Sequence, residues 1–453
     1  MDYRKPALLV TTVGAFLVPF MGSSINIALP SIGKEFEMNA VLLPWITISY
    51  LLSSTIFLIP FGRIGDIHGR KKVFVSGFMI YTISSLFCAM STSALSLISF
   101  RVLNGIGASM IFSIGMAILT SVFPPGERGR VIGINIAAVY SGLSFGPFFG
   151  GLLTHHFGWR SIFLINLPLG TLMVLLIIWK LKGEWAEAKG EKFDLFGSVL
   201  FGMTLVAIMY GFSTLPKMGG FSFVLLGLLG MLIFVKWEMR TETPLFNMDL
   251  FRKNKVFAYS NLAALINYSA TFAISFLMSL YLQFIKGLSP QEAGTVLIAQ
   301  PLVQAVFSPV AGRLSDRIEP RMVASIGMAL TAVGLFLFTF LNQETALSHI
   351  VGTLVLLGFG FALFSSPNTN AVMGSVENKY YGVASGTLST MRSTGTMLSM
   401  GITMMIFAIY IGRAQITSPH YPLFLRSLNV IFAIFTILCV VGIFPSLSRG
   451  RMR

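Results

Sequence analysis

The chain has 453 residues, of which 55% are hydrophobic and only 11% are charged. A water-soluble domain carries about a quarter charged residues, so this composition excludes an ordinary soluble protein and predicts an integral membrane protein. The formal net charge of +15 would suit a nucleic-acid partner, but the placement of the basic residues argues otherwise.

Fourteen apolar stretches follow one another along the chain, each close to the roughly 20 residues that a membrane-spanning helix needs. They lie at residues 7–30, 42–61, 73–91, 95–119, 131–153, 160–180, 193–213, 219–236, 256–282, 291–311, 322–341, 348–373, 380–411 and 424–445. The loops between them are too short to form a soluble catalytic domain. We therefore expect an all-α integral membrane protein that works within or across the bilayer.

The basic residues gather on one side of this predicted topology. Of the 32 Lys and Arg residues, six fall in loops on one side, 24 fall on the other, and Arg101 and Arg392 lie inside spans. The positive-inside rule then predicts a cell membrane protein with both termini in the cytoplasm. Because the topology accounts for the basic excess, we expect the protein to lie in a lipid bilayer and not to bind nucleic acid.

A short basic motif between the second and third spans recurs later in the chain. Residues 62–72 read Gly-Arg-Ile-Gly-Asp-Ile-His-Gly-Arg-Lys-Lys, and residues 312–316 repeat Gly-Arg-aliphatic-small-Asp 250 positions later. Such a repeat predicts two related halves, as in many secondary transporters. Because six-span halves leave two spans over, the predicted arrangement is six, two and six. The predicted domains are residues 1–180, a connector with two extra spans at 181–254, and residues 255–453.

The repeated motif combines glycines with opposite charges at the end of a span. Glycines permit a tight turn and close helix approach, and a carboxylate among arginines can form charge-assisted hydrogen bonds. We therefore expect a conformational latch; a solvated basic loop is the alternative. The residues assigned to this latch are Gly62, Arg63, Asp66, Gly69 and Arg70, with Gly312, Arg313 and Asp316 in the second copy.

Two arginines lie where a charge is costly. A cation in a span costs about 3 kcal/mol on insertion scales and is seldom present without a role. Arg101 and Asn104 share a helical face, which favours a function for this pair. Arg392 is its counterpart in the later half, although its side chain could equally extend to the membrane interface.

Taken together, these motifs resemble the fourteen-span drug:proton antiporter branch of the major facilitator superfamily. The matching stretches are residues 26–30, 45–52, 62–72, 101–108, 142–151 and 159–168. The resemblance implies two six-helix halves that alternate access to a central site, and it assigns Arg101 to proton relay. It also implies an antiporter motif at the interface of the halves, formed by Gly142, Gly146, Pro147, Gly150 and Gly151.

One position departs from the family pattern. The branch normally carries an aspartate five residues before Asn26, and here that position is Met21. All 17 carboxylates fall in loops or at span ends, so proton uptake and attraction of cationic drugs lack an evident group. The residues left to form a site are polar but uncharged apart from the arginines: Asn26, Asn104, Asn267, Gln300 and Gln304, with Arg101 and Arg392.

The predicted function is export of lipophilic small molecules, driven by the proton gradient. The alternative is a carrier of a neutral or anionic metabolite, or a transporter without proton coupling, which the missing acid favours. An enzyme would need a nucleophile or clustered acids and histidines within the spans, and a channel would have no use for two latches. We expect no cofactor or metal, a small-molecule substrate with protons as the coupled ion, and a monomer.

Overall fold

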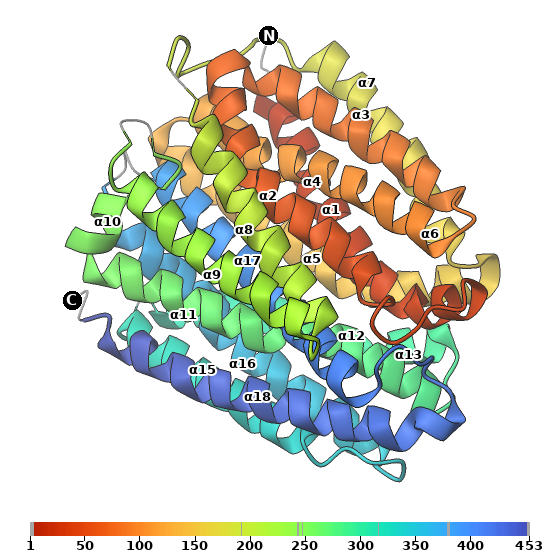
Figure 1. The fold of residues 1–453 in the computed structure, drawn as a ribbon. Helices are drawn as coiled ribbons and strands as arrows, with labels where there is room; N and C mark the ends of the chain where they lie inside the picture. The colour runs from red at the N-terminus through yellow and green to blue at the C-terminus, as the bar shows by residue number, and fades with distance from the viewer. Residues whose placement is uncertain are drawn as a thin grey trace. The chain divides into compact units, whose positions relative to one another are not determined.

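The computed structural model describes residues 4–191, 193–241, 244–246, 248–315, 317–377 and 381–450. Within these ranges the chain forms helices joined by turns, and no strand is present (Figure 1). The helices are α1 (Arg4–Glu35), α2 (Trp45–His68), α3 (Arg70–Ala89), α4 (Ala94–Val122), α5 (Pro125–Phe157), α6 (Arg160–Leu164), α7 (Asn166–Lys180), α8 (Leu195–Thr214), α9 (Met218–Glu238), α10 (Met248–Lys253), α11 (Lys255–Thr271), α12 (Ala273–Leu280), α13 (Pro290–Leu297), α14 (Ala299–Ser315), α15 (Pro320–Phe338), α16 (Leu347–Gly374), α17 (Tyr381–Tyr410) and α18 (Tyr421–Ser448).

Fourteen helical stretches in the described part of the chain are long and apolar enough to cross a membrane, which confirms the predicted number. Some of these stretches are built from consecutive helices, such as α6 with α7 and α13 with α14. Local sequence fixes several starts. Ser289 and Glu292 form a capping box at α13, with Pro290 in the first turn, and such caps satisfy the free N–H groups at a helix start.

Two compact units divide the chain. Unit 1 comprises Met1–Phe36, Trp45–Ile208 and Val224–Leu245; unit 2 comprises Glu37–Pro44, Met209–Phe223 and Phe246–Arg453. The two extra helices, α8 and α9, form a hairpin whose residues are shared between the units. The six, two and six arrangement, with boundaries at residues 180 and 254, stays a prediction.

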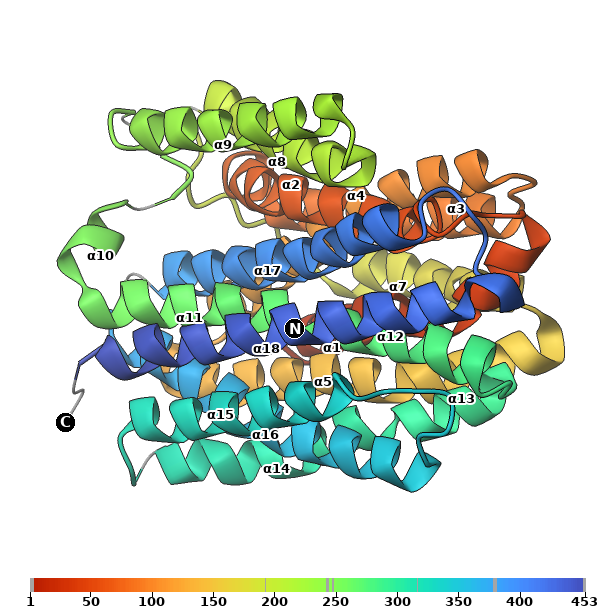
Figure 2. The ribbon, with the colours of Figure 1, turned by 60° about the horizontal axis from the view of Figure 1, so that its bottom comes forward.

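Within unit 1, α1 packs against α5, α2 and α3 pack on α4, and α7 lies beside α3 (Figure 1). Within unit 2, α15 packs against both α16 and α18, and α14 lies beside α16 (Figure 2). A close helix contact recurs in both units at glycines 250 residues apart. A Cβ added at Gly77 of α3 would lie 3.2 Å from the Gly107 carbonyl oxygen of α4, and one at Gly327 of α15 would lie 2.7 Å from the Gly360 carbonyl oxygen of α16.

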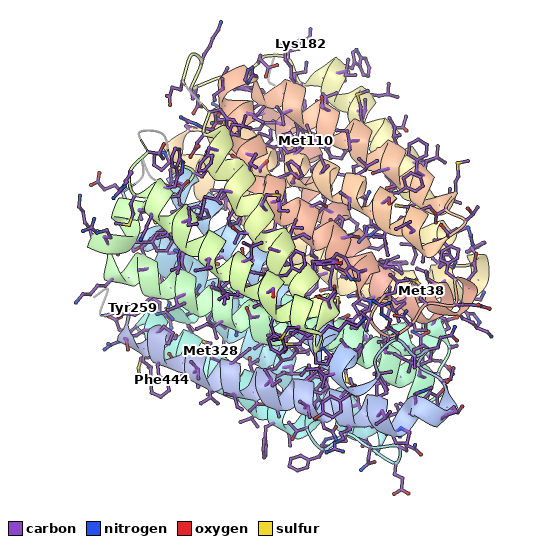
Figure 3. The ribbon with its side chains drawn as sticks, viewed as in Figure 1. Met38, Met110, Lys182, Tyr259, Met328 and Phe444 are labelled. Carbon is purple, nitrogen blue, oxygen red and sulfur yellow. The ribbon has the colours of Figure 1, made fainter. Side chains whose placement is uncertain are left out.

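Large apolar side chains lie on the outer surface as well as in the core (Figure 3). Met110 and Met328 are buried between helices, whereas Phe444 of α18 is 67% exposed. In α9 most apolar residues are exposed, although the helix is long enough to span a bilayer. Such a surface is unfavourable in water and favourable against lipid, and this multi-pass membrane protein presents it along its spans.

Candidate functional site

The first motif is a junction between two helices rather than a loop. The predicted second span ended at residue 61, but α2 continues to His68 and α3 begins at Arg70, which corrects the predicted loop. Gly65 allows this continuation because its bare Cα packs on α4, where an added Cβ would lie 2.2 Å from Cδ1 of Ile114. Gly69 separates the helices with φ of 121°, a backbone conformation that glycine adopts readily.

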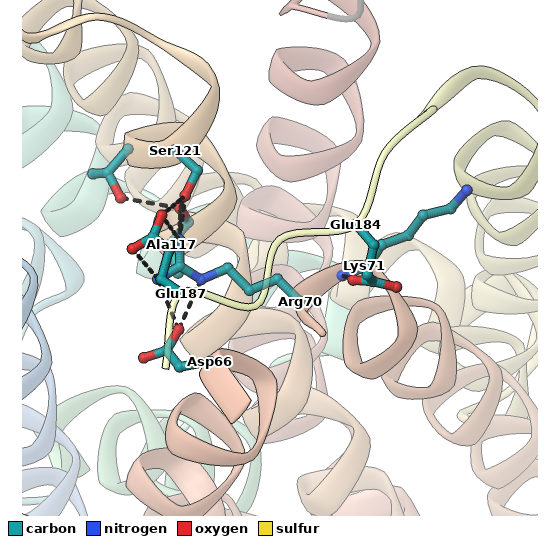
Figure 4. Close-up of polar contacts among 8 residues, drawn as sticks. Asp66, Arg70, Lys71, Ala117, Ser121, Glu184 and Glu187 are labelled. Carbon is teal, nitrogen blue, oxygen red and sulfur yellow. Dashed lines mark hydrogen bonds and ion pairs between the residues drawn. The ribbon is translucent and has the colours of Figure 1, made fainter. Parts of the chain in front are cut away.

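Arg70 is the centre of a polar cluster at this junction (Figure 4). Its side chain is only 8% exposed. It donates to Asp66 Oδ1 at 2.7 Å, to the Ala117 carbonyl oxygen of α4 at 3.2 Å, and to Ser121 Oγ. Its two terminal nitrogens donate to the two carboxylate oxygens of Glu187 at 2.9 and 3.1 Å. This bidentate geometry gives strong, charge-assisted bonds, so the motif does pair Asp66 with Arg70 and adds a second acid.

Glu187 belongs to the connector that follows α7, and two further acids of this connector also contact the junction. Glu184 Oε1 accepts from the backbone N–H of Lys71 at 2.8 Å, in the first turn of α3, where a negative charge is favoured. Glu191 pairs with Arg63. The sequence predicted a connector beginning at residue 181, but it did not predict these contacts. One sequence feature could have predicted these contacts. Three of the 17 acids of the chain lie close together at Glu184, Glu187 and Glu191, and the basic run at residues 70–72 offers them partners.

The second copy of the motif is less complete. Gly312 and Arg313 lie near the end of α14, and a Cβ added at Gly312 would lie 2.9 Å from Ser366 Oγ of α16. The Asn370 amide donates to Ser315 Oγ at 2.9 Å. Asp316, predicted as the acid of this latch, lies outside the described residues.

Arg101 of α4 is fully buried and is held by neutral groups. Its Nε donates to the Ile46 carbonyl oxygen of α2 at 3.1 Å, and one terminal nitrogen donates to Asn104 Oδ1 at 2.9 Å. The guanidinium carbon lies 4.1 Å from the centre of the Tyr50 ring, a cation–π contact that offsets part of the desolvation cost. Among the described residues, the other terminal nitrogen has no hydrogen-bond partner, and no ion pair includes Arg101.

Asn104 extends this network to two further helices. Its amide nitrogen lies 3.2 Å from each of three acceptors on α3, namely the Tyr81 carbonyl oxygen and the hydroxyls of Ser84 and Ser85. The Tyr81 hydroxyl in turn donates to the Leu17 carbonyl oxygen of α1 at 3.5 Å. The pairing of Arg101 with Asn104 agrees with their predicted common face, and it links α1, α2, α3 and α4 of unit 1.

Met21 lies one helical turn beyond Leu17, on the same face of α1. It is fully buried, and the Asn166 amide of α7 lies 3.7 Å from its sulfur. A thioether is a weak acceptor, so the position where the family pattern has an acid holds an uncharged group. Nearby on α1, Asn26 Oδ1 accepts from Thr47 of α2 at 3.4 Å. These contacts make the α1 side of the site neutral.

Three of the four glycines of the predicted antiporter motif, Gly142, Gly146 and Gly150, face α1. An added Cβ would lie 2.3 Å from the Phe16 carbonyl oxygen at Gly142 and 2.8 Å from Cα of Ser24 at Gly150. The Gly146 carbonyl oxygen accepts from Ser24 Oγ at 2.9 Å. The other two residues of this motif, Pro147 and Gly151, are buried in the same helix. The described packing of this stretch is therefore within unit 1, and its role at an interface of halves stays a prediction.

The residues predicted in the later half lie on three helices of unit 2, α11, α14 and α17. Arg392 of α17 donates to Thr369 Oγ1 of α16 at 2.5 Å, and its guanidinium carbon lies 5.6 Å from the ring centre of Tyr268 on α11. Asn267 is buried on α11, and its amide nitrogen has no hydrogen-bond partner among the described residues. Gln300 and Gln304 lie on α14.

A buried arginine in unit 2 was missed by the sequence analysis. Arg449, directly after α18, is 1% exposed. It donates to the Ser446 carbonyl oxygen at 2.8 Å, to Ser260 Oγ of α11 at 3.1 Å, and to Asn368 Oδ1 of α16 at 3.0 Å. Burial lowers its pKa to about 10. By sequence it was one of several basic residues of the terminal tail, and nothing in the pattern distinguished it from them.

Across the described residues, no group of three or more His, Cys, Asp or Glu side chains could hold a metal ion. The acids that the structure describes lie at helix ends or in the connections between helices. The groups available in the middle of the spans are therefore neutral hydrogen-bonding groups and the guanidinium groups of Arg101 and Arg392. Such groups can bind a solute.

Comparison with known proteins gives a consistent picture. The model of the Major Facilitator Superfamily matches residues 11–239 and 261–451. The chain is 31% identical over 446 residues to the riboflavin transporter RibZ of Clostridioides difficile (strain 630), covering 98% of this chain and 97% of that protein. It is 29% identical over 419 residues to the multidrug resistance protein Stp of Mycobacterium tuberculosis (strain CDC 1551 / Oshkosh), covering 91% and 77%.

Among solved structures, a bacterial homologue of the human lysosomal transporter Spinster, inward-facing and unoccupied, aligns with a TM-score of 0.72 at 17% identity. The alignment covers 99% of this chain and 97% of that one. At this identity the likeness concerns the fold, and it agrees with the all-helical architecture that the sequence predicts.

Proposed function

Since the chain belongs to the Major Facilitator Superfamily and is a transporter rather than an enzyme, we propose that it exports uncharged, lipophilic organic molecules by alternating access. Alternating access means that two halves rock about a site near the middle of the membrane. The proposed location is the cell membrane, with both termini in the cytoplasm and a monomer as the working unit.

The observation that carries the proposal is the neutral environment of Met21. The Asn166 amide rests against its sulfur, and the nearby Arg101 is held by a carbonyl, an amide and a phenol ring. A site for cationic drugs needs a negative group to offset the cost of removing the cation from water. Neutral hydrogen-bonding groups on an apolar background suit a neutral solute with a few polar atoms.

The relatives support this choice of substrate class. The RibZ protein, similar over almost its whole length, is named for riboflavin, which carries no charge on its ring system at neutral pH. We therefore take riboflavin as the first probe because it is uncharged; it tests the charge of the solute rather than its lipophilicity, and it is not taken as the established substrate.

The second candidate function is proton-coupled export of cationic drugs. The resemblance of Stp, a multidrug resistance protein, favours it. In this alternative the proton would be carried at the ends of the spans rather than in their middle. Asp66 at the α2–α3 junction and the adjacent His155 and His156 at the end of α5, whose ring centres are 4.9 Å apart, are the available groups.

The test uses purified protein in liposomes with an imposed pH gradient. Riboflavin accumulation is followed with the gradient intact and then collapsed, and empty liposomes and the Arg101→Ala variant serve as controls. Accumulation that needs the protein and Arg101 supports the proposal, and its loss on collapse of the gradient would add proton coupling. Accumulation of ethidium but not riboflavin would reject neutral solutes and support the second candidate.

A further inference from the structure

Residues 184–191, which we name the strap, lie against the α2–α3 junction, where Glu187 also accepts from Ser121 Oγ of α4 at 2.8 Å. Five contacts join the strap to α2 and α3. Two join backbone to backbone: Arg70 N–H donates to the Trp185 carbonyl oxygen at 2.8 Å, and Ala188 N–H donates to the Asp66 carbonyl oxygen at 2.9 Å. The other three are made by the carboxylates of the strap: Glu184 with Lys71 N–H, Glu187 with Arg70, and Glu191 with Arg63. The strap thus follows the junction along its length.

The strap completes α3 as well as covering it. The first N–H groups of a helix have no partner within the helix, and here Trp185 and Glu184 supply acceptors for Arg70 and Lys71. Gly69 makes room for this, because an added Cβ would lie 2.5 Å from Cδ of Glu184. The close fit indicates a built contact rather than a loop that happens to pass nearby.

The strap is nevertheless held by bonds that water can replace. The side chains of Glu187 and Glu191 are 62% and 55% exposed, so water can solvate both carboxylates when the strap lifts. The pair of Glu191 with the partly exposed Arg63 contributes little to stability by itself, whereas the pair of Glu187 with the buried Arg70 is the stronger of the two. Arg70 keeps Asp66, Ala117 and Ser121 as acceptors when Glu187 leaves. Without the strap, the Arg70 guanidinium therefore keeps protein partners, whereas the backbone N–H groups of Arg70 and Lys71 exchange their strap acceptors for water.

The strap also leads directly into the extra hairpin. Asp194 accepts from Gly197 N–H at the start of α8 and from the Trp237 ring N–H at the end of α9, at 2.8 and 2.9 Å. Within unit 1, Gly202 of α8 lies against α2, where an added Cβ would be 3.0 Å from Cγ2 of Ile56. The strap therefore connects the α2–α3 junction to the hairpin along the chain, and α8 of the hairpin also packs on α2, the helix that ends at the junction.

We infer that the strap is a releasable clamp, which docks on the α2–α3 junction in one state of the transport cycle and leaves it in another. Glu187 is the positioning residue of the docked state, because it binds both terminal nitrogens of Arg70 while Asp66 binds Nε. The extra hairpin is then the element that follows the release. This inference rests on the proposed function only in requiring a transport cycle, whatever the solute.

The first experiment measures release without any substrate. Ala188 is 7% exposed in the docked strap, so a cysteine there reacts with a maleimide only after the strap lifts. Purified Ala188→Cys protein in detergent is labelled with and without Glu187→Gln, and the unmodified protein, whose Cys88 and Cys439 are buried, gives the background. Glu187→Gln should raise the labelling rate by about three-fold or more, because it removes a bidentate ion pair of which only the carboxylate is exposed. The matched control Glu344→Gln, an acid in an exposed turn of unit 2, should leave it unchanged.

The second experiment locks the strap. Arg63→Cys with Glu191→Cys places two thiols where the structure has an ion pair between long side chains, and a bifunctional thiol reagent with a reducible spacer joins them across that gap. Cross-linking should stop transport of whichever probe the unmodified protein carries, and reductant should restore it. Continued transport by the cross-linked protein, or a labelling rate that Glu187→Gln does not change, would overturn the inference. If the unmodified protein transports neither riboflavin nor ethidium, the proposed function fails. The labelling rate still tests whether the strap is released, because it needs no substrate.

Discussion

The Asn166 amide nitrogen lies 3.7 Å from the sulfur of Met21, inside the bundle of unit 1. In the family pattern that the motifs resemble, the α1 position holds an aspartate, and here a thioether faces the amide instead. The neighbouring network around Arg101 contains carbonyls, amides, hydroxyls and aromatic rings. This neutral surrounding is the basis for expecting a neutral solute.

Restoring an acid at this position should change the substrate class. The Met21→Asp variant places a carboxyl group beside the Asn166 amide, where burial raises a carboxyl pKa and favours proton uptake. We expect gradient-dependent ethidium transport that the unmodified protein lacks, measured in liposomes. Met21→Asn is the matched control, similar in size but unable to ionise. Equal ethidium transport by both variants would show that the acid is irrelevant.

Removing the buried cation should abolish transport without unfolding the protein. Arg101→Ala deletes a charge that no carboxylate offsets, but it leaves the Ile46 carbonyl and the Asn104 amide without their donor. Each such loss costs about 1–3 kcal/mol, so a moderate fall in melting temperature is expected in detergent. Arg413→Ala, at an exposed position in unit 2, is the control. Full transport by Arg101→Ala would reduce this residue to a packing role.

The junction acid should matter for turnover more than for folding. Asp66→Asn removes one of the two carboxylates on Arg70 but keeps the size of the side chain, and Asp66 is 30% exposed. We expect slower transport with a melting temperature close to that of the unmodified protein, because a partly exposed ion pair contributes about 1 kcal/mol or less. Transport at the normal rate would be inconsistent with a conformational latch.

Close packing of α5 on α1 should make one glycine indispensable. Gly142→Ala brings a Cβ to 2.3 Å from the Phe16 carbonyl oxygen, and backbone cannot move aside as a side chain can. Overpacking of this kind costs about 1–3 kcal/mol. Gly133→Ala in the same helix is the matched control, because nothing lies within 4 Å of its added Cβ. The difference between the two melting temperatures, measured in the same detergent, isolates the contact.

The fold was largely predictable from the sequence because a bilayer leaves few choices. Backbone polar groups in lipid must be paired within the segment, so long apolar runs form helices, and the count of fourteen is confirmed. Helix ends were less predictable. The apolar run of α2 stops near residue 61, yet the helix continues to His68 because Gly65 packs on Ile114 and because Asp66 pairs with Arg70 four residues later.

The candidate site was predictable only where its contacts are local. Arg101 and Asn104 are three residues apart, and helical spacing alone brings them together. Glu187 reaches Arg70 across 117 residues, and Arg449 reaches Ser260 across 189. No periodic pattern encodes such contacts. Both residues lie in polar segments whose charges are, by composition alone, indistinguishable from solvated ones.

The charge of the solute is tested most directly by competition. Liposomes containing the protein, with a pH gradient imposed, are offered riboflavin and ethidium together, and the initial rates of accumulation of both are measured. The neutral surroundings of Met21 and Arg101 predict that riboflavin accumulates and that ethidium neither accumulates nor slows it. Gradient-driven accumulation of ethidium with riboflavin excluded would contradict the account and require a proton and cation site elsewhere in the chain.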